Sequence, residues 1–423
     1  MKNDLAISAW RVLLPTALGT GLSLIGDTAL YAVLPTHALE AGVTVATIGI
    51  LLSANRFVRL FLNGPLGLLY DRFPRRYLFV ASLFIGAMST AIYALTSGFW
   101  PLLLGRLLWG LAWAGIWVGG NTIILDISNA SNRGRWVGIY QTSFFLGASA
   151  GAVLGGILTD WLGFHQAMGI GAALTLLGAV IALIFLPETK YLRIRRRPPG
   201  QTTSTELIPE VQPHRRAEFA SAMALLGVNR LVLAGILLPT FGLYLLQKIG
   251  PTVEIAGLTV GVATLTGLAL GLNALVAMAS TPLTGNLSDK ANNRWQVAAA
   301  GLIPGITGFA LLAFGSSLTL ILGIPLTAVS GGSNQGLSTA LVGDLSPEHQ
   351  RGRRLGGLFT VGDFASAIGP PLAYSVLIPT LGLSLVYLLC GGLFAAICLV
   401  ALGWAVKLKA AVGSGGAAQG IDQ

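Results

Sequence analysis

Five ionisable side chains lie inside long apolar stretches of this sequence, namely Asp27, Arg56, Arg59, Arg106 and Asp363. Removing a charge from water is costly, so a charge within an apolar stretch is a candidate for function by default. Carboxylates in such surroundings can carry protons, and arginines can neutralise them or hold two helices together. These residues are therefore the first candidates for the chemistry of the protein.

Asp27 belongs to a polar stripe within the first apolar stretch. On a helix, where successive residues turn by about 100°, Thr20, Ser23, Asp27 and Tyr31 lie on one face. The stripe predicts the lining of a water-filled cavity, although a hydrogen bond between packed helices would also explain it. Counting residues from the ends of their stretches places Asp27 and Arg106 at comparable depth.

We interpret Asp27 as the candidate proton carrier, Arg106 as its partner and Asp363 as the competing carrier. Burial favours the protonated carboxyl group, whereas a nearby arginine favours the ionised form. Movement of Arg106 would therefore shift the balance between the two forms.

Other polar and aromatic residues extend the candidate cavity. They lie at helical spacing within further apolar stretches: Trp113, Trp117, Gln141, Tyr244, Gln247, Asn273, Ser330 and Asn334. The two tryptophans could stack on a flat ligand near Arg106, or they could only fill packing space. Hydroxyl groups in such stripes could also bond back to their own helix.

The composition is that of a membrane protein. Apolar residues make up 54% of the 423 residues and charged residues only 10%, whereas a soluble domain carries roughly 25% charged residues. The net charge of +10 comes from Lys and Arg in short loops, a pattern typical of cytoplasmic loops and not of a nucleic-acid-binding surface. The sequence contains neither metal-ligand spacing nor a phosphate-binding loop. We therefore expect no metal, no cofactor and no enzymatic activity.

Apolar runs long enough to cross a bilayer as helices recur along the chain. The fold class is therefore all-α and integral to the membrane, and the basic loops predict that both termini are cytoplasmic. We predict twelve spans near residues 12–34, 44–69, 77–97, 99–125, 136–160, 167–187, 229–250, 257–287, 294–315, 318–343, 354–378 and 382–405. The first six spans form an N-terminal six-helix bundle (1–187), and the last six form a C-terminal six-helix bundle (228–409). A cytoplasmic linker (188–227) joins the two bundles, and a disordered tail (410–423) follows the second.

The two halves of the chain repeat each other. Asp71 and Arg76 follow the second span, and Asp289 and Arg294 follow the eighth. Asp289 lies 218 residues after Asp71, and Arg294 lies 218 residues after Arg76. Asp126 and Asp344 are separated by the same 218 residues. A constant offset indicates duplication of a six-helix unit in parallel orientation, which is the architecture of one large class of transporters.

At these motifs the chain resembles the major facilitator superfamily. The loop signature of that family appears as Gly67 to Arg76, with Pro74 in place of a glycine, and the fourth-span signature appears as Arg106 and Gly110. The fifth-span antiporter signature appears as Gly147, Gly151 and Gly155, with Ala152 in place of its proline. Glycines at this spacing also suit close helix packing. The resemblance is greatest to the twelve-span drug:proton antiporters and to sugar and metabolite exporters.

The resemblance implies a set of residues that gate the cytoplasmic side. The loop aspartate, here Asp71, would face a helix N-terminus of the other half, and Asp126 would pair with Arg75. Asp363 would pair with Arg56 or Arg59 between the second and eleventh spans. The full set of candidate gating residues is Arg56, Arg59, Gly67, Asp71, Arg72, Arg75, Asp126, Arg133, Gly285, Asp289, Asp344 and Arg351.

The favoured function is proton-coupled efflux of a small organic solute or drug by alternating access, carried out by a monomer in a bacterial cytoplasmic (inner) membrane. Its partners would be the small-molecule substrate, protons and the lipid bilayer. One alternative is symport or facilitated uptake of a sugar or metabolite. Another is a membrane sensor on the same fold that transports nothing. Substrate-driven proton flux in vesicles distinguishes proton-coupled efflux from symport or facilitated uptake.

Asp71→Asn tests the gating role. We expect slower transport with nearly unchanged substrate affinity, because the residue lies in a cytoplasmic loop away from the polar stripes. The measurement is the transport rate and the apparent affinity in proteoliposomes. A full transport rate in the variant would remove Asp71 from the gate.

Overall fold

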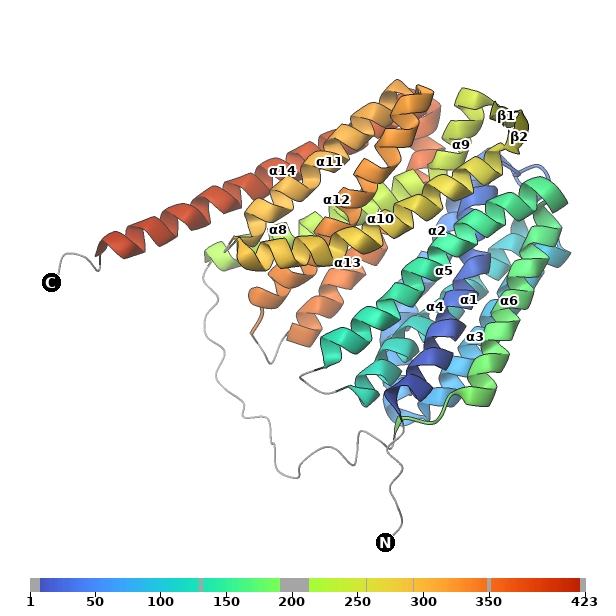
Figure 1. Ribbon diagram of the computed structural model, residues 1–423, viewed down its shortest axis with the longest axis horizontal. Helices are drawn as coiled ribbons and strands as arrows, with labels where there is room; N and C mark the ends of the chain where they lie inside the picture. Colours follow the sequence, from blue (N-terminus) through green and yellow to red (C-terminus); the bar gives the residue numbers. More distant parts are fainter. Residues whose placement is uncertain are drawn as a thin grey trace, which may run out of the picture. The chain divides into compact units, whose positions relative to one another are not determined.

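The computed structural model describes residues 8–128, 132–190, 213–255, 257–291, 293–347 and 351–418, and these residues are helical almost throughout (Figure 1). Helices satisfy every backbone polar group within one segment, as a lipid environment requires. The helices of the first half are α1 (Ala9–Val33), α2 (Val45–Arg72), α3 (Arg75–Leu95), α4 (Phe99–Ile127), α5 (Arg133–Leu162) and α6 (Phe164–Phe185).

The second half contains longer and more irregular helices. Its first helix runs without interruption from α8 (Pro213–Asn229) through the π-helical segment η1 (Arg230–Leu237) into α9 (Leu238–Ile249). The others are α10 (Val262–Lys290), α11 (Arg294–Phe314), α12 (Ser317–Asp344), α13 (Arg351–Leu372) with the π-helical segment η3 (Ala373–Leu377), and α14 (Ile378–Ala418). Gly382 interrupts α14 with a φ of 73°.

A helix occupies each stretch that the sequence predicts to be a span, with one local difference. The predicted span 257–287 begins too early, because strands β1 (Thr252–Ile255) and β2 (Leu258–Gly261) form an antiparallel hairpin before α10. Alternating β-branched residues favour a strand, and Gly257 with a φ of 80° makes the turn. Ten of the described helices are long and apolar enough to cross a membrane. The count of twelve spans and the location of the termini stay predictions.

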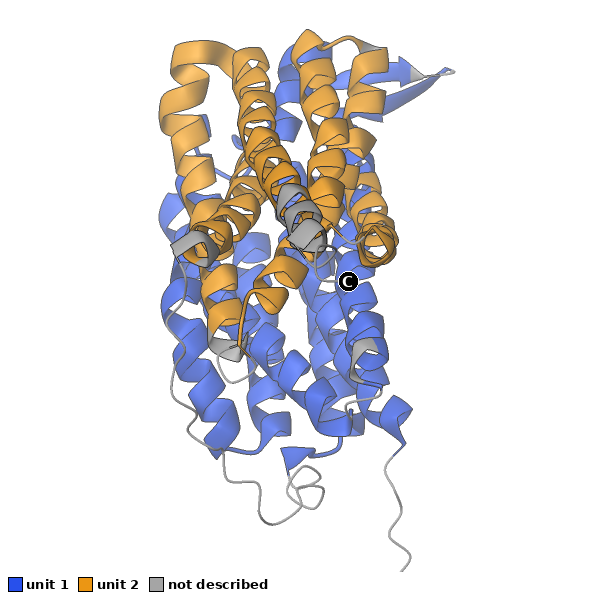
Figure 2. Cartoon of the chain, turned by 90° about the vertical axis from the view of Figure 1, so that its left-hand side faces the viewer, with its two compact units in different colours: residues 1–208, 239–271 blue, residues 209–238, 272–423 orange. Residues whose placement is uncertain are grey.

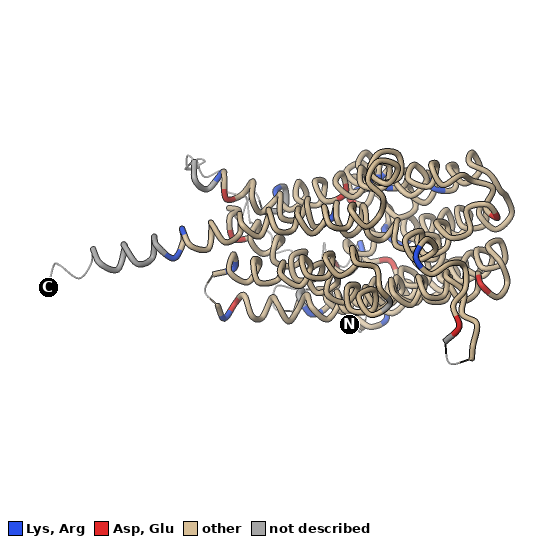
Figure 3. The backbone as a smooth tube through the Cα atoms, turned by 90° about the horizontal axis from the view of Figure 1, so that it is seen from above, with Lys and Arg blue, Asp and Glu red and all other residues tan. Residues whose placement is uncertain are grey.

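Apolar residues cover the outside of the bundle. Charges are sparse along the helices (Figure 3), and large side chains such as Phe61, Leu95 and Phe314 are 76%, 82% and 78% exposed. A water-soluble protein rarely exposes so much contiguous apolar surface. The chain is therefore a multi-pass membrane protein whose outer surface contacts lipid.

The chain divides into two compact units, drawn in blue and orange in Figure 2. Unit 1 comprises residues 1–208 and 239–271, and unit 2 comprises residues 209–238 and 272–423. Unit 1 therefore contains the first-half helices together with α9, the hairpin and the start of α10. In unit 1, α1 packs on α5 and α6, while α3 and α4 pack on each other. In unit 2, α11 packs on α12 and α14.

Glycines bring α5 into backbone contact with α1. A Cβ atom at Gly147 would lie 2.7 Å from the Cα atom of Gly21, and one at Gly151 would lie 2.7 Å from the Cα atom of Ile25. Gly155 meets Ala29 in the same way. Small residues at the contact allow dispersion contacts between backbones, which lipid cannot replace.

Gly147→Ala should destabilise the protein because its new methyl group meets backbone atoms that cannot rotate away. We expect a loss of about 1–3 kcal/mol in the free energy of unfolding, as for overpacked cores. The measurement is the thermal unfolding midpoint of the purified protein in detergent.

Gly138→Ala is the matched control on the same helix, because no atom lies within 4 Å of the position of its added Cβ. Alanine is a better helix former than glycine, so the midpoint should stay the same or rise slightly. Equal losses in the two variants would contradict the packing argument.

Candidate functional site

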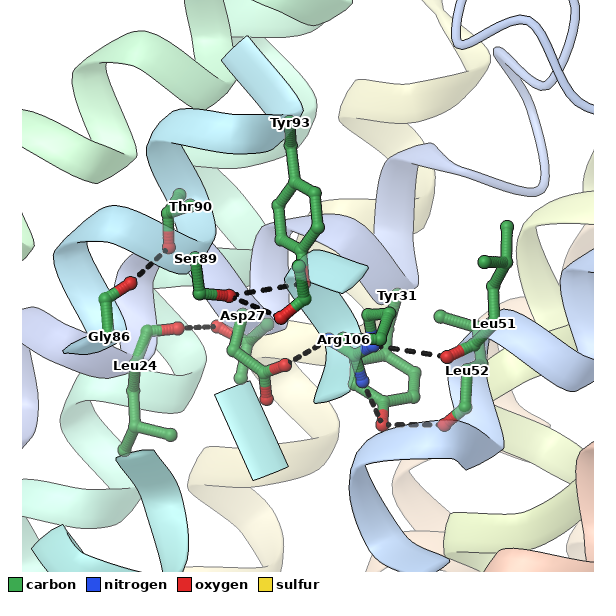
Figure 4. A network of polar contacts seen from close by, with 12 residues as sticks. Leu24, Asp27, Tyr31, Leu51, Leu52, Gly86, Ser89, Thr90, Tyr93 and Arg106 are labelled. Carbon is green, nitrogen blue, oxygen red and sulfur yellow. Dashed lines mark hydrogen bonds and ion pairs between the residues drawn. The ribbon is translucent and has the colours of Figure 1, made fainter. Parts of the chain in front are cut away.

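Asp27 on α1 and Arg106 on α4 form an ion pair in the interior of unit 1. Arg106 Nη1 donates to Asp27 Oδ1 at 2.5 Å, and the side chains are 0% and 11% exposed respectively. Figure 4 shows the two side chains pointing toward each other. A buried pair requires good geometry and further hydrogen bonds to offset the cost of removing both charges from water.

Unit 1 supplies those further hydrogen bonds to the guanidinium group. Arg106 Nε donates to the carbonyl oxygen of Leu51 at 3.1 Å, and Nη2 donates to the hydroxyl of Tyr31 at 3.2 Å. The Tyr31 hydroxyl donates in turn to the carbonyl oxygen of Leu52 at 3.3 Å. Arg106 is therefore held by α1 and α2 at once, and Asp27 is only one of its acceptors.

Gly110 explains why α2 can lie so close to Arg106. A Cβ atom at this position of α4 would lie 2.7 Å from the carbonyl oxygen of Asn55 and 2.7 Å from the Cβ atom of Val58. The arginine and the glycine four residues later therefore act together, because the glycine lets the α2 backbone come within reach of the guanidinium.

Tyr31 also contacts two arginines through its ring. The guanidinium carbon of Arg56 lies 5.3 Å from the ring centroid and that of Arg106 lies 5.5 Å from it. Both distances fall within the range of cation–π attraction. Tyr31 thus links Arg56 to the Asp27–Arg106 pair through its ring.

The other predicted cavity residues of unit 1 lie among aromatic side chains. Trp113 and Trp117 stack with ring centroids 5.6 Å apart, and Phe144 of α5 lies 5.3 Å from Trp117. The hydroxyl of Thr20 is hydrogen-bonded to that of Tyr140 at 3.0 Å. Tyr140 and Phe144 were missed by the sequence analysis, because an isolated aromatic residue in an apolar helix carries no signal of its own.

The remaining candidates differ in exposure. Ser23 is buried and donates to the carbonyl oxygen of Thr20 on its own helix, while Gln141 is half-buried. On α9, Tyr244 is buried with Lys248 over its ring, and Gln247 is exposed. Their place in a common cavity stays a prediction.

The candidates of unit 2 contact neighbouring helices. Asn273 Nδ2 donates to the carbonyl oxygen of Ile324 at 3.4 Å. Ser330 and Asn334 are fully buried against the glycines of α11, since a Cβ atom at Gly305 would lie 2.6 Å from Ser330 Oγ and one at Gly301 would lie 3.5 Å from Asn334 Nδ2. These contacts place both residues at the α11–α12 packing surface.

A second polar cluster lies at the basic-loop end of unit 1. Arg75 Nε and Asp126 Oδ2 are 2.9 Å apart, which confirms the pairing that the resemblance implied. The hydroxyl of Thr189 also donates to Asp126 Oδ2 at 2.9 Å. Glu188 accepts hydrogen bonds from the backbone N–H groups of Arg75 and Arg76 at 3.0 and 3.1 Å, so it caps the N-terminus of α3. The sequence analysis had placed Glu188 and Thr189 in the linker.

The repeated motif of unit 2 makes its contacts one position later. Arg294, which corresponds to Arg76 in the repeat, lies 2.7 Å from Asp289 and 2.6 Å from Asp344. These carboxylates are 64% and 59% exposed, whereas Asp126 is fully buried.

The other gating candidates have open surroundings. Asp71 and Arg72 are exposed, and no atom lies within 4 Å of a Cβ added at Gly67 or Gly285. The side chains of Arg133 and Arg351 lie outside the described residues. The proposed pairing of Asp363 with Arg56 or Arg59 joins the two units and stays a prediction.

Asp126→Asn and Asp344→Asn compare the same repeat position in a buried and an exposed setting. Asp126→Asn leaves the Arg75 guanidinium, 4% exposed, without its carboxylate, so we expect a loss of about 3–5 kcal/mol in stability. Asp344→Asn should cost only about 0–1 kcal/mol, as for a solvent-exposed ion pair. Unfolding midpoints of the two purified variants provide the comparison, and similar shifts would contradict it.

Sequence comparison finds relatives along most of the chain. A sequence model of the Major Facilitator Superfamily matches residues 16–324 and 235–419. The chain is 27% identical over 363 residues to the class B tetracycline resistance protein of Escherichia coli, covering 84% of each chain. It is 24% identical to an uncharacterized MFS-type transporter of Methanocaldococcus jannaschii, covering 91% of this chain and 94% of that one.

Solved structures show the same fold. A bacterial homolog of the human lysosomal transporter Spinster, in an inward-facing and occupied conformation, has a TM-score of 0.73 at 19% identity and covers 93% and 97% of the two chains. A POT family transporter in complex with 5-aminolevulinic acid has a TM-score of 0.75 at 14% identity and covers 93% and 96%. The expected fold class is therefore confirmed, and the chain belongs to the major facilitator superfamily of transporters.

Proposed function

We propose that this transporter couples proton entry to the export of a small organic solute, and that Asp27 carries the proton. The observation that supports this proposal is the buried ion pair of Asp27 with Arg106. An ionised carboxylate in the interior of a membrane protein is stable only with a partner, and removing the partner costs several kcal/mol. Asp27 therefore either holds Arg106 or takes up a proton.

The surroundings of Arg106 allow both states. When Asp27 is protonated and no longer needs a counter-charge, the guanidinium keeps the Leu51 carbonyl oxygen and the Tyr31 hydroxyl as acceptors. A substrate that binds only while Asp27 is ionised and paired with Arg106 would promote loss of the proton, and protonation of Asp27 would promote release of the substrate. Substrate and proton then exclude each other from the site, and this exclusion is the basis of antiport.

The names of the relatives favour export. Several matched proteins are tetracycline resistance proteins, and resistance is a natural consequence of removing a drug from the cell. The bacterial inner membrane fits these relatives as the location. Uptake by symport is the alternative, and it would use the same Asp27 in the opposite direction.

The two basic-loop clusters form the proposed cytoplasmic gate. In this view the Arg75–Asp126–Thr189 contacts hold the first repeat together, while Asp71 remains exposed to meet a helix N-terminus of the second half. Asp363 with Arg56 or Arg59 would add a contact that forms in one state of the cycle only. The six-helix bundles at 1–187 and 228–409 are the bodies that we propose to move.

Asp27→Asn tests the coupling role, because asparagine has a similar shape but cannot take up or release a proton. In proteoliposomes under an imposed pH gradient, with tetracycline as the first probe of a small-molecule panel, the variant should lose pH-driven accumulation. Exchange of labelled for unlabelled substrate should persist. Accumulation at the parental rate would exclude Asp27 as the carrier.

Glu254→Gln is the matched control, since it neutralises an exposed carboxylate on the β1 strand. Its accumulation and its substrate-induced proton flux should equal those of the parent protein. The direction of proton flux on adding substrate distinguishes antiport from symport in both proteins.

A further inference from the structure

Asp160, at the end of α5, accepts a hydrogen bond from the start of α10. Its Oδ2 atom lies 2.6 Å from the backbone nitrogen of Thr264, the third residue of α10. The first N–H groups of a helix have no partner within the helix and carry the positive end of its dipole. The first turn of α10 contains no acidic residue of its own. The Asp160 carboxylate, which comes from α5, therefore supplies the negatively charged acceptor at this helix start.

The chain around this contact is shaped to admit the carboxylate. A Cβ atom at Gly261 would collide with the Asp160 side chain, so a glycine is needed at the residue before α10. Val262 donates its backbone N–H to the carbonyl oxygen of Pro251 at 2.8 Å, which closes the base of the β hairpin. The hairpin and Gly261 thus present the helix start to Asp160.

Below Asp160, α5 and α10 lie in backbone contact along a continuous seam. A Cβ atom at Gly156 would lie 2.8 Å from the carbonyl carbon of Ala263, and one at Gly267 would lie 3.0 Å from that of Ala152. Further along, Ser149 Oγ donates to the carbonyl oxygen of Gly271 at 3.0 Å. The seam joins a first-half helix to a second-half helix, and all of these residues belong to unit 1.

We propose that Asp160 is a positioning residue of the outer gate and holds the α5–α10 seam closed at the end opposite the basic loops. Alternating access requires the two halves to separate at that end in one state, and the Asp160–Thr264 contact must then break. This inference rests on the alternating-access part of the proposed function and needs neither the substrate nor the proton site. Asp160 acts through α10, and its proposed role does not depend on the Asp27 site.

Glu40 offers a matched comparison within unit 1. Its Oε1 atom accepts a hydrogen bond from the backbone nitrogen of Phe164, the first residue of α6, at 2.8 Å. This contact also joins a carboxylate to a helix N-terminus, but both residues lie in the first half of the chain. Removing it should loosen a helix start without opening a seam between halves.

The test measures the exposure of a buried cysteine in the full-length transporter. The parent carries Cys390→Ala and Cys398→Ala, which replace the two free cysteines. Thr266→Cys places the reporter on α10, where Thr266 is 0% exposed and a Cβ added at Gly242 would lie 3.2 Å from its Cγ2 atom. Thr175→Cys on α6, also 0% exposed, is the reporter away from the seam. A membrane-impermeant maleimide is added from outside to intact cells.

Asp160→Ala should raise the labelling rate at position 266 about tenfold, the size expected from losing a charge-assisted hydrogen bond at a helix N-terminus. The rate at position 175 should not change, and Glu40→Ala should change neither rate. Asp160→Asn keeps an oxygen acceptor but removes the charge, so its rate at position 266 should fall between the parent and Asp160→Ala.

An unchanged rate at position 266, an equal rise at positions 266 and 175, or an equal effect of Glu40→Ala would each overturn the gate role of Asp160. If Asp160→Ala does not yield folded protein, Asp160→Asn decides, and a parental rate at position 266 then overturns it. Labelling requires no substrate and no pH gradient. The labelling result therefore does not depend on whether Asp27→Asn supports or contradicts the proton-carrier proposal.

Discussion

The Arg106 guanidinium lies where no water can solvate it, and the arrangement of unit 1 follows from that constraint. A buried arginine cannot shed its charge, since its guanidinium stays protonated under all physiological conditions. It must therefore find acceptors in several directions, and α1 and α2 provide them through Asp27, Tyr31 and the Leu51 carbonyl oxygen. The Arg106 side chain of α4 thus connects α1 and α2, two helices that have no evident link in the sequence.

Close backbone approach is the means by which these acceptors come within range. Gly110 lets α2 reach α4, and Gly147 and Gly151 let α5 reach α1. Hydrophobic burial offers little drive for helix association in lipid, so contacts of this kind and buried polar bonds must hold the bundle together. Close packing through small residues also occurs on two faces of α5, where one set of small residues contacts α1 and another set contacts α10.

The sequence predicts the helices well, because apolar length, basic loops and a constant repeat offset are properties of short segments. It also places Asp27 and Arg106 at one depth. The hairpin was missed since its second strand, Leu258–Gly261, contains no charge and continues directly into the apolar helix α10. Glu188 and Asp160 were missed because their partners lie more than a hundred residues away and are backbone groups, which leave no trace in residue type. The shift from Arg75 to Arg294 within the repeat follows from residue type, because the 218-residue offset places Asn293, which has no charge, where the first half has Arg75.

The boundaries between the compact units fall inside helices, and this has a mechanical consequence. One boundary separates Leu238 from Pro239 and the other separates Gly271 from Leu272, so no loop is available there as a hinge. The π-helical segment η1 ends at Leu237, two residues before Pro239, which offers no N–H to the helix. Proline and irregular helical hydrogen bonding are the usual causes of helix bending, so the continuous helix from α8 to α9 is expected to bend most readily at this point.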